Sequence, residues 1–273
     1  MPVAAKIALP PPTVGRSVQR WQGDESDLTR RTVPEETAVA LSYNRVGYAV
    51  MMASPCDLEN FAVGFSLTER LIVRPDEIEE LELIPVPAGI EARMWIAPAR
   101  MDALLGRRRT LAGPTGCGLC GLEALDQAMR EPPRVPDGCR FTAAAVRDAM
   151  ESLGPAQLLN QTTRAMHAAA LYVPGEGLVA LQEDVGRHNA LDKLAGALAR
   201  TGVDPARGMV IMTSRVSVEL IQKAAVMGAA VLCAVSVPTA LAIRVADAAG
   251  ITIAAIARGD RFEVFTHPHR IIS

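Results

Sequence analysis

The feature that most constrains the fold is a regular alternation of apolar runs and amphipathic segments in the second half of the 273-residue chain. Each amphipathic segment ends at a glycine, the residue type favoured just past the end of a helix. This alternation predicts right-handed crossovers and a largely parallel sheet with helices packed on it. The expected strands are residues 178–182, 209–213, 229–235, 251–256 and 262–266, and the expected helices are residues 186–200, 216–227 and 239–249.

The first half of the chain predicts a smaller α+β unit. Residues 36–52 are expected to form two strands that meet at Asn44 and Arg45, and residues 54–57 to cap a helix over residues 58–72. Three consecutive prolines indicate a frayed arm at the N-terminus. The predicted organisation is a proline-rich arm (1–34), an α+β domain (35–109), a cysteine loop and connector (110–140) and an α/β domain (141–273). In the α+β domain we also expect strands at 78–85 and 91–97 and a helix at 98–105. In the α/β domain we also expect a helix at 142–153 and a strand at 168–173.

The composition excludes several classes of protein. A formal net charge of −2, from 28 basic and 30 acidic side chains, argues against a general nucleic-acid binder. Five cysteines, an odd number, argue against a secreted disulfide scaffold and favour reduced thiols in the cytoplasm. The N-terminus does not resemble a signal peptide. The nearly uncharged residues 224–243 contain Gly228 and Pro238, so we expect a buried strand between two helices there and no membrane span.

The strongest chemical feature is a glycine-rich loop that contains Cys117 and Cys120. Two thiols at this spacing can share a metal, form a disulfide or carry a transferred sulfur. A helix expected after Gly121 would favour a thiolate in the loop, and the thiolate is the nucleophile in sulfur chemistry. Three arginines at 107–109 could attract an anionic partner to it. A persulfide carrier is therefore one interpretation of this loop.

Three other interpretations of the cysteine pair compete with it. Structural zinc would need further ligands, such as Cys139 with His167 or His188, at a spacing that fits no common pattern. A zinc deaminase would need an H-x-E motif, which the chain lacks. A thioredoxin-like pair would follow a strand at the start of a helix, whereas this pair lies in a loop between domains.

Polar residues follow several expected strands, and in a parallel sheet they would gather at one edge. Residues 183–193, which include His188 and Lys193, join a strand end to a helix start. Residues 213–223 and 236–239 follow two other strands in the same way. Lys193 and Lys223 are two of only three lysines in the chain, and we expect their ammonium groups to hold a phosphate or a carboxylate. The convergence predicts an anion site at this edge.

The last two expected strands meet at a turn that contains two arginines. It comprises Ile256, Ala257, Arg258, Gly259, Asp260 and Arg261. The turn is either a solvated connection or a clamp for an anion near the same edge.

Five motifs, in chain order, make the sequence resemble the formate dehydrogenase accessory sulfurtransferase family (FdhD/NarQ). They are CGLCG, DVGRHNALDK, SRVSVELIQK, SVPT followed by LA one residue later, and GITIAAIARGDR. The resemblance runs from about residue 35 to the C-terminus.

The resemblance implies a sulfur carrier in which Cys117, with Cys120 beside it, accepts sulfane sulfur from a cysteine desulfurase as a persulfide. The persulfide would sulfurate the bis-molybdopterin guanine dinucleotide molybdenum cofactor, bound as substrate, before its insertion into formate dehydrogenase. The family's cofactor-binding segment corresponds to residues 256–261, although Ile256 stands where many members carry an aromatic residue. The resemblance also implies a homodimer, no resident metal, and a three-layer α/β/α domain similar to the cytidine deaminase-like fold.

The sequence therefore leaves three hypotheses about function. The first is a persulfide sulfurtransferase for cofactor maturation. The second is a chaperone that binds the cofactor or a guanine nucleotide without transferring sulfur. The third is a zinc or dithiol redox protein.

Overall fold

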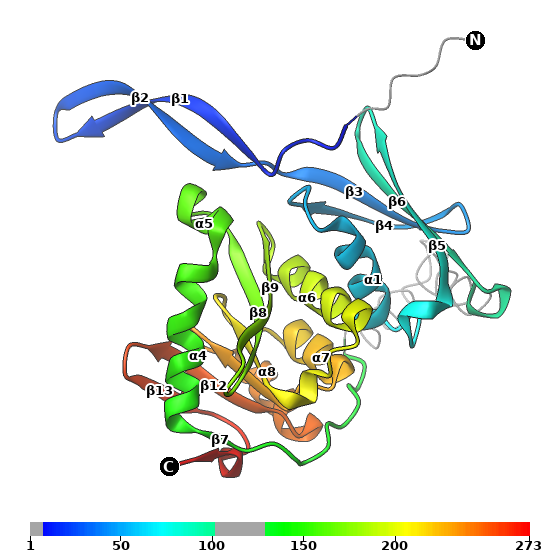
Figure 1. Ribbon diagram of the computed structural model, residues 1–273, viewed down its shortest axis with the longest axis vertical. Helices are drawn as coiled ribbons and strands as arrows, with labels where there is room; N and C mark the ends of the chain where they lie inside the picture. Colours follow the sequence, from blue (N-terminus) through cyan, green and yellow to red (C-terminus); the bar gives the residue numbers. More distant parts are fainter. Residues whose placement is uncertain (1–7, 102–128) are drawn as a thin grey trace, which may run out of the picture.

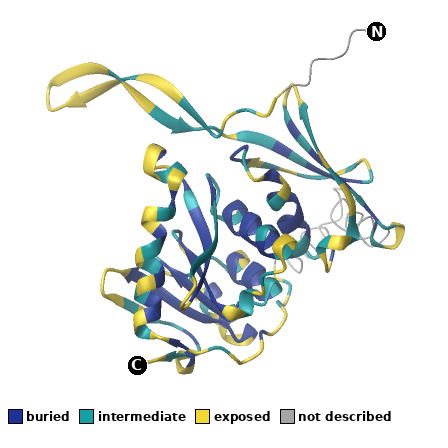
Figure 2. Ribbon diagram, in the orientation of Figure 1, coloured by how far each residue is buried: buried dark blue, intermediate teal, exposed yellow. Residues whose placement is uncertain are grey.

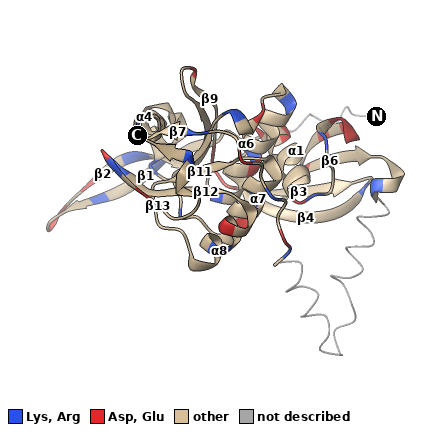
Figure 3. Cartoon of the chain, turned by 90° about the horizontal axis from the view of Figure 1, so that it is seen from below, with Lys and Arg blue, Asp and Glu red and all other residues tan. Residues whose placement is uncertain are grey.

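The computed structural model describes residues 8–101 and 129–273 of the chain. The description begins with a long two-stranded ribbon, β1 (Thr13–Gln22) and β2 (Glu25–Pro34), which extends away from the rest of the molecule (Figure 1). Nearly all of its residues are at least partly exposed, and Trp21 and Leu28 are 63% and 85% exposed (Figure 2). Basic side chains are spread along it, and acidic ones lie at its tip (Figure 3). The arm expected to be frayed over residues 1–34 is therefore largely an ordered hairpin.

The N-terminal domain is a four-stranded sheet covered on one face by a single helix. The strand order is β4-β3-β6-β5. Helix α1 packs on apolar side chains such as Val39, Leu41 and Met94. The elements are β3 (Thr37–Tyr43), β4 (Val46–Ala53), α1 (Leu58–Thr68), β5 (Ile78–Val86) and β6 (Gly89–Ile96). The predicted hairpin, its turn at Asn44 and Arg45, and both later strands are confirmed.

The predicted start of α1 at Leu58 is confirmed, but its predicted capping and its predicted end need correction. Asp57 is the N-cap residue, but its side chain makes no capping hydrogen bond. The helix ends at Thr68 rather than at residue 72. Ser54, expected to help cap the helix, instead contacts the second domain.

The second domain is a six-stranded sheet with helices on both faces (Figure 1). Helices α6, α7 and α8 pack on one face through a large apolar core. Helix α4 packs on the other face through Val146, Ala149 and Leu153. The elements are β7 (Phe141–Thr142), α4 (Ala143–Ala156), α5 (Leu158–Thr163), β8 (His167–Val173), β9 (Gly177–Asp184), α6 (Arg187–Thr201), β10 (Met209–Met212), α7 (Val218–Met227), β11 (Val231–Ala234), α8 (Ala240–Ala249), β12 (Thr252–Arg258), β13 (Arg261–Val264) and β14 (Ile271–Ile272).

The strand directions correct the prediction of a largely parallel sheet. The order is β13-β12-β11-β10-β8-β9, and only β10–β11 and β11–β12 pair in parallel. The two ends of the sheet are hairpins, β8–β9 and β12–β13, which tight turns force to be antiparallel. The predicted helices are confirmed, and Gly202, Gly228 and Gly250 end three of them in left-handed conformation. The likeness to the cytidine deaminase-like fold stays a prediction.

No helix among the described residues is long and apolar enough to span a membrane. The apolar run at 224–243 is divided into the end of α7, strand β11 and the start of α8, as predicted.

The two domains meet where α1 crosses α6 at the closest approach that backbones allow. Gly64 of α1 faces Gly196 of α6, and each lies against the backbone of the other helix. A Cβ atom at Gly64 would overlap the carbonyl of Asp192, and one at Gly196 would overlap the carbonyl of Asn60. Helix α1 is thus shared between its own sheet and the second domain (Figure 1).

We expect Gly64→Ala and Gly196→Ala each to lower the free energy of unfolding by about 3 kcal/mol, the upper end of the usual cost of overpacking, because a methyl group pressed on rigid backbone cannot relax by changing rotamer. Gly154→Ala in α4 is the matched control, since a Cβ there meets no atom within 4 Å. It should stabilise the protein by roughly 0.5–1 kcal/mol. Urea unfolding measures all three, and equal effects at the three sites would contradict the close crossing.

Candidate functional site

The candidate site lies at one edge of the six-stranded sheet, where strand ends and helix starts converge. Strand β8 is antiparallel to both β9 and β10, so β9, β10, β11 and β12 all run in one direction and end at the same edge. Helix α6 begins directly after β9, and α7 begins shortly after β10. The predicted convergence of polar segments on one edge is therefore confirmed, although the sheet is mixed.

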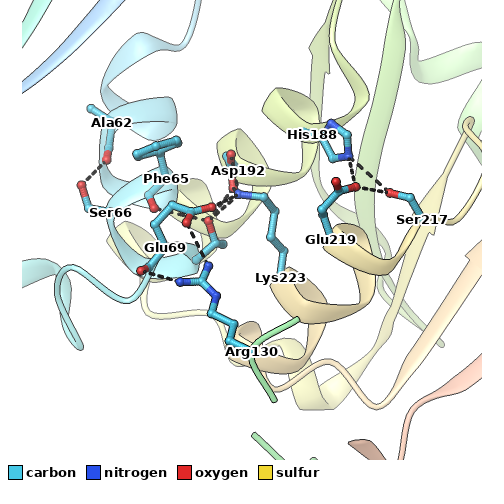
Figure 4. A network of polar contacts seen from close by, with 11 residues as sticks. Ala62, Phe65, Ser66, Glu69, Arg130, His188, Asp192, Ser217, Glu219 and Lys223 are labelled. Carbon is cyan, nitrogen blue, oxygen red and sulfur yellow. Dashed lines mark hydrogen bonds and ion pairs between the residues drawn. The ribbon is translucent and has the colours of Figure 1, made fainter. Parts of the chain in front are cut away.

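His188 joins the starts of the two helices. It lies in the first turn of α6, and its Nε2 is 3.3 Å from Ser217 Oγ and 3.2 Å from a carboxylate oxygen of Glu219 (Figure 4). Ser217 is the N-cap residue of α7, but its hydroxyl donates to Glu219 at 2.8 Å instead of accepting from the helix backbone. The predicted site residue His188 is therefore at this edge, in contact with both helices.

A second histidine, which the predicted site did not include, lies at the same edge. His167 begins β8, and its Nδ1 is 3.4 Å from Thr213 Oγ1 at the end of β10. Burial and then the guanidinium of Arg187 lower the pKa of His167, and the same two causes lower that of His188. Both pKa values therefore lie below the ordinary 6.5. The unfolded chain then binds more protons below pH 6.5, so these groups make folding less favourable as pH falls.

Lys193 is placed in the contact between the domains. Its side chain is 0% exposed and its Nζ is 2.7 Å from Asp184 Oδ2, which is equally buried. Nζ also donates to the carbonyl of Ser54 at 3.1 Å, and the backbone N–H of Ser54 donates to Asp184 at 3.0 Å. The ammonium thus holds a carboxylate, one of the two predicted roles, and its position does not fit a direct contact with bound cofactor.

Lys223 forms a second buried pair across the same contact (Figure 4). Its Nζ is 2.9 Å from Asp192 Oδ1, 3.0 Å from Thr68 Oγ1 and 3.2 Å from Glu69 Oε1. Burial opposes the charge on Lys223, but Asp192 and Glu69 outweigh it and raise its pKa. Arg130 adds a further ion pair to Glu69 at 2.9 Å.

The two acidic partners, Asp184 and Asp192, were missed as key residues. Both lie in the segment that the sequence singled out, at the end of β9 and inside α6. Their signal is an acidic residue at a position where helix and strand patterns place apolar ones, which marks a carboxylate that needs a buried partner.

The turn at residues 256–261 carries backbone strain and exposed charge. Ile256 has φ of 55°, a conformation that β-branched residues rarely adopt, at an irregularity in the β12–β13 pairing. Arg258 and Arg261 are exposed and lie directly opposite each other, which is unfavourable for like charges. Arg258 Nε donates to the carbonyl of Val235, next to the end of β11, at 3.3 Å. The turn therefore lies at the same edge as His188.

The cysteine loop lies outside the described residues, so the placement of Cys117, Cys120 and the arginines at 107–109 stays untested. Three other cysteines are described as free thiols. Burial raises the pKa of Cys233 to about 12 and is the largest of the causes that raise that of Cys56. Cys233 lies in β11 within the core, as expected of a packing residue. Among the described residues, no group of three His, Cys, Asp or Glu side chains is placed to hold a metal ion.

The fold defines a two-domain α/β protein in which strand ends and helix starts gather at one sheet edge beside the domain contact. The sequence profile of the FdhD/NarQ family matches residues 34–272, so the chain belongs to that family.

Similar proteins cover almost the whole chain. A protein of Agrobacterium fabrum named sulfur carrier protein FdhD is 51% identical over 246 residues, 89% of this chain and 90% of that protein. One of the same name from Cupriavidus necator is 47% identical over 271 residues, 99% of this chain and 94% of that protein. A crystal structure described as that of a formate dehydrogenase accessory protein from Desulfotalea psychrophila has a TM-score of 0.76 at 24% identity. It covers 96% of this chain and 100% of that one, and it supports the fold.

We expect Arg187→Gln to raise the pKa of both His167 and His188, because loss of the guanidinium charge makes each imidazolium less costly. Glu219→Gln is the opposite control, and it should lower the pKa of His188 further because a favourable carboxylate is lost. Titration of the ring protons by NMR measures both effects. Unchanged histidine pKa values in Arg187→Gln would show that its charge does not act on the two rings.

Ile256→Asn and Ile271→Asn should both reduce the free energy of unfolding. The reduction should be about 1–2 kcal/mol smaller at Ile256, because asparagine adopts the positive φ of that position more readily than isoleucine. Ile271 is the matched control, since it is also partly buried but has an ordinary φ of −104°. Denaturant unfolding of the two variants gives the difference. An equal loss at both positions would show that Ile256 is not strained.

Proposed function

We propose that this chain is a sulfur carrier for the maturation of formate dehydrogenase. It accepts sulfane sulfur from a cysteine desulfurase as a persulfide on Cys117 and passes it to the bis-molybdopterin guanine dinucleotide cofactor. Membership of the FdhD/NarQ family, with relatives about half identical that are named as sulfur carriers, is the observation that carries this proposal. We further propose that the protein is a cytoplasmic homodimer.

The chemistry of the transfer follows from thiolate reactivity. The Cys117 thiolate attacks the outer sulfur of the desulfurase persulfide, which forms an S–S bond on Cys117 and releases the desulfurase cysteine as a thiolate. The cofactor then supplies an electron pair to the outer sulfur on Cys117, so that a new bond to this sulfur forms as the S–S bond breaks and Cys117 leaves as a thiolate. We propose that Cys120, three residues away in the sequence, assists the transfer.

The geometry of the sheet edge supports a role for it in holding the cofactor. The turn at 256–261 has strained backbone at Ile256 and carries two exposed arginines, and His188 lies at the same edge beside two helix starts. Strained backbone is most often retained where it serves a site, and helix starts favour phosphate groups. Lys193 contributes by holding Asp184, which fixes the turn that leads into α6.

The test is to incubate the full chain with a cysteine desulfurase and cysteine and to locate added sulfur by mass spectrometry. We expect one added sulfur, about 32 Da, on Cys117, and its loss in Cys117→Ala. Cys233→Ala is the control and should load normally, because its thiol is buried and its pKa is about 12. Sulfur found only on other cysteines would contradict the assignment.

Two further measurements separate the alternatives. If Cys117→Ala still activates formate dehydrogenase in cells, the chain acts as a cofactor or guanine-nucleotide chaperone without sulfur transfer. Stoichiometric zinc in the purified chain would instead favour a zinc or dithiol redox protein.

A further inference from the structure

A cavity lined by charged side chains lies at the opposite edge of the six-stranded sheet from His188. Strands β10, β11 and β12 all begin at that edge, near β7 and the C-terminus (Figure 1). The cavity has a volume of about 400 Å³, within the roughly 300–1,000 Å³ of small-molecule sites. Strand β12 spans seven residues, so about 20 Å separates this cavity from the turn at 256–261. The polar side chains that line it are those of Arg134, Asp137, His267, His269 and Arg270.

Arg270 is a buried guanidinium group that the described chain pairs incompletely. Its side chain is 2% exposed, and its Nη1 donates to Thr252 Oγ1 at 3.1 Å. Its Nε lies 3.2 Å from Asp137 Oδ1 but makes no hydrogen bond to any described residue. Buried donors are nearly always paired, and an unpaired one of a charged group is costly. Arg270 therefore calls for a further acceptor at this cavity.

The cavity carries more positive than negative charge. Among the described residues that line it, Asp137 is the one acidic residue, and it is shared between Arg270 and His269, whose Nε2 is 3.2 Å from its Oδ1. The hydrogen bond from His269, and then the charge of Arg270, lower the pKa of Asp137. The side chain of Arg134 makes no hydrogen bond or ion pair with any described residue. Two permanent positive charges thus face a single carboxylate.

The C-terminal end of α8, which borders the cavity, does not account for these two arginines. A helix end attracts cations through its last carbonyl groups. Here the carbonyl of Asp247 accepts from His267 Nε2 at 2.9 Å, and that of Ala249 accepts from the backbone N–H of Val135 at 2.8 Å. The Asp247 carboxylate is also beside His267, at 3.5 Å. The helix end is therefore satisfied by the histidine and by backbone.

We propose that Arg134 and Arg270, with His267 and His269, bind a phosphate group in this cavity, either as free phosphate or in a small phosphate monoester. Guanidinium groups match the oxygens of phosphates and carboxylates. Donors from four side chains exceed what the two oxygens of one carboxylate can use, and they suit the three terminal oxygens of a phosphate monoester. The site goes beyond the proposed function and does not rest on it.

Calorimetric titration of the full chain with glycerol 3-phosphate, inorganic phosphate and acetate tests this site. We expect both phosphates to bind more tightly than acetate. Arg134→Gln should weaken both by at least about tenfold, the scale of one lost charge-assisted hydrogen bond. Arg31→Gln is the matched control, because Arg31 is exposed on the distant β2 and likewise has no partner among the described residues. It should change none of the three affinities.

A gain of affinity is expected in Asp137→Asn, because the carboxylate competes with the ligand for Arg270 and His269. Phosphate should bind about fivefold more tightly, the scale of one charge repulsion at about 4 Å in water. Weaker binding in this variant would contradict the placement of phosphate beside Asp137.

The comparison of probes distinguishes the source of the phosphate. Tighter binding of glycerol 3-phosphate than of inorganic phosphate supports a monoester, and equal binding supports free phosphate at the same site. If wild type binds neither phosphate, if acetate binds as tightly as both, or if Arg134→Gln binds them as tightly as wild type, the proposal is overturned.

A second measurement uses the wild-type chain alone, so that it does not depend on the folding of a variant. The chain has four histidines, of which His267 and His269 line this cavity and His167 and His188 lie at the opposite edge. Saturating inorganic phosphate should shift the ring-proton NMR signals of His267 and His269. Shifts confined to His167 and His188, or no shifts at all, would overturn the site. Neither measurement involves sulfur, so the persulfide on Cys117 stands or falls separately.

Discussion

The contact between α1 and α6 is the constraint on which the rest of this structure depends. The two helices touch through the backbones of Gly64 and Gly196, so no side chain separates them at the crossing. Such a close approach fixes both the distance between α1 and α6 and their relative rotation, because protein interiors are close-packed and tolerate little displacement. Helix α6 begins at the candidate ligand edge, so the crossing also sets where that edge lies relative to the N-terminal domain.

Two buried ion pairs complete this contact, and they account for both lysines in the described chain. Asp184 with Lys193 and Asp192 with Lys223 each reach residues of the other domain, Ser54 in one case and Thr68 in the other. A buried pair contributes little net stability when intact, but loss of one member leaves an uncompensated charge that costs about 3–5 kcal/mol. The pairs therefore act mainly to permit one arrangement of the domains and to penalise others.

The same pairs determine the chemistry of the neighbouring edge. Asp184 lies three residues before Arg187 and would be a natural partner for it, but its oxygens are occupied by Lys193 and three other donors. Among the described residues, Arg187 Nε has no hydrogen-bond partner, and the charge of Arg187 helps to lower the pKa of His167 and His188.

Most of the helices and strands of the second domain could be predicted, because the periodicity of apolar residues and the glycines that end helices are local properties of the sequence. It could not predict the β1–β2 ribbon, because a hairpin exposed on most of its residues has no apolar face to give it a period. Nor could it place Lys193 in the contact between the domains, since its partner there, Ser54, lies 139 residues away. His188 was found because it lies two residues after a glycine at a helix start, whereas His167 becomes a site residue only once the strands are ordered in the sheet.

The most direct test of the central claim is native-state hydrogen exchange, which reports the free energy of opening for each segment. If the glycine crossing and the ion pairs bind the domains into one unit, the core amides of β3 and α1 and those of α6 and β10 will exchange with the same opening free energy. They will also respond to denaturant with the same slope. If β3 and α1 open at a much lower free energy while α6 and β10 stay protected, the domains are independent and the account is contradicted.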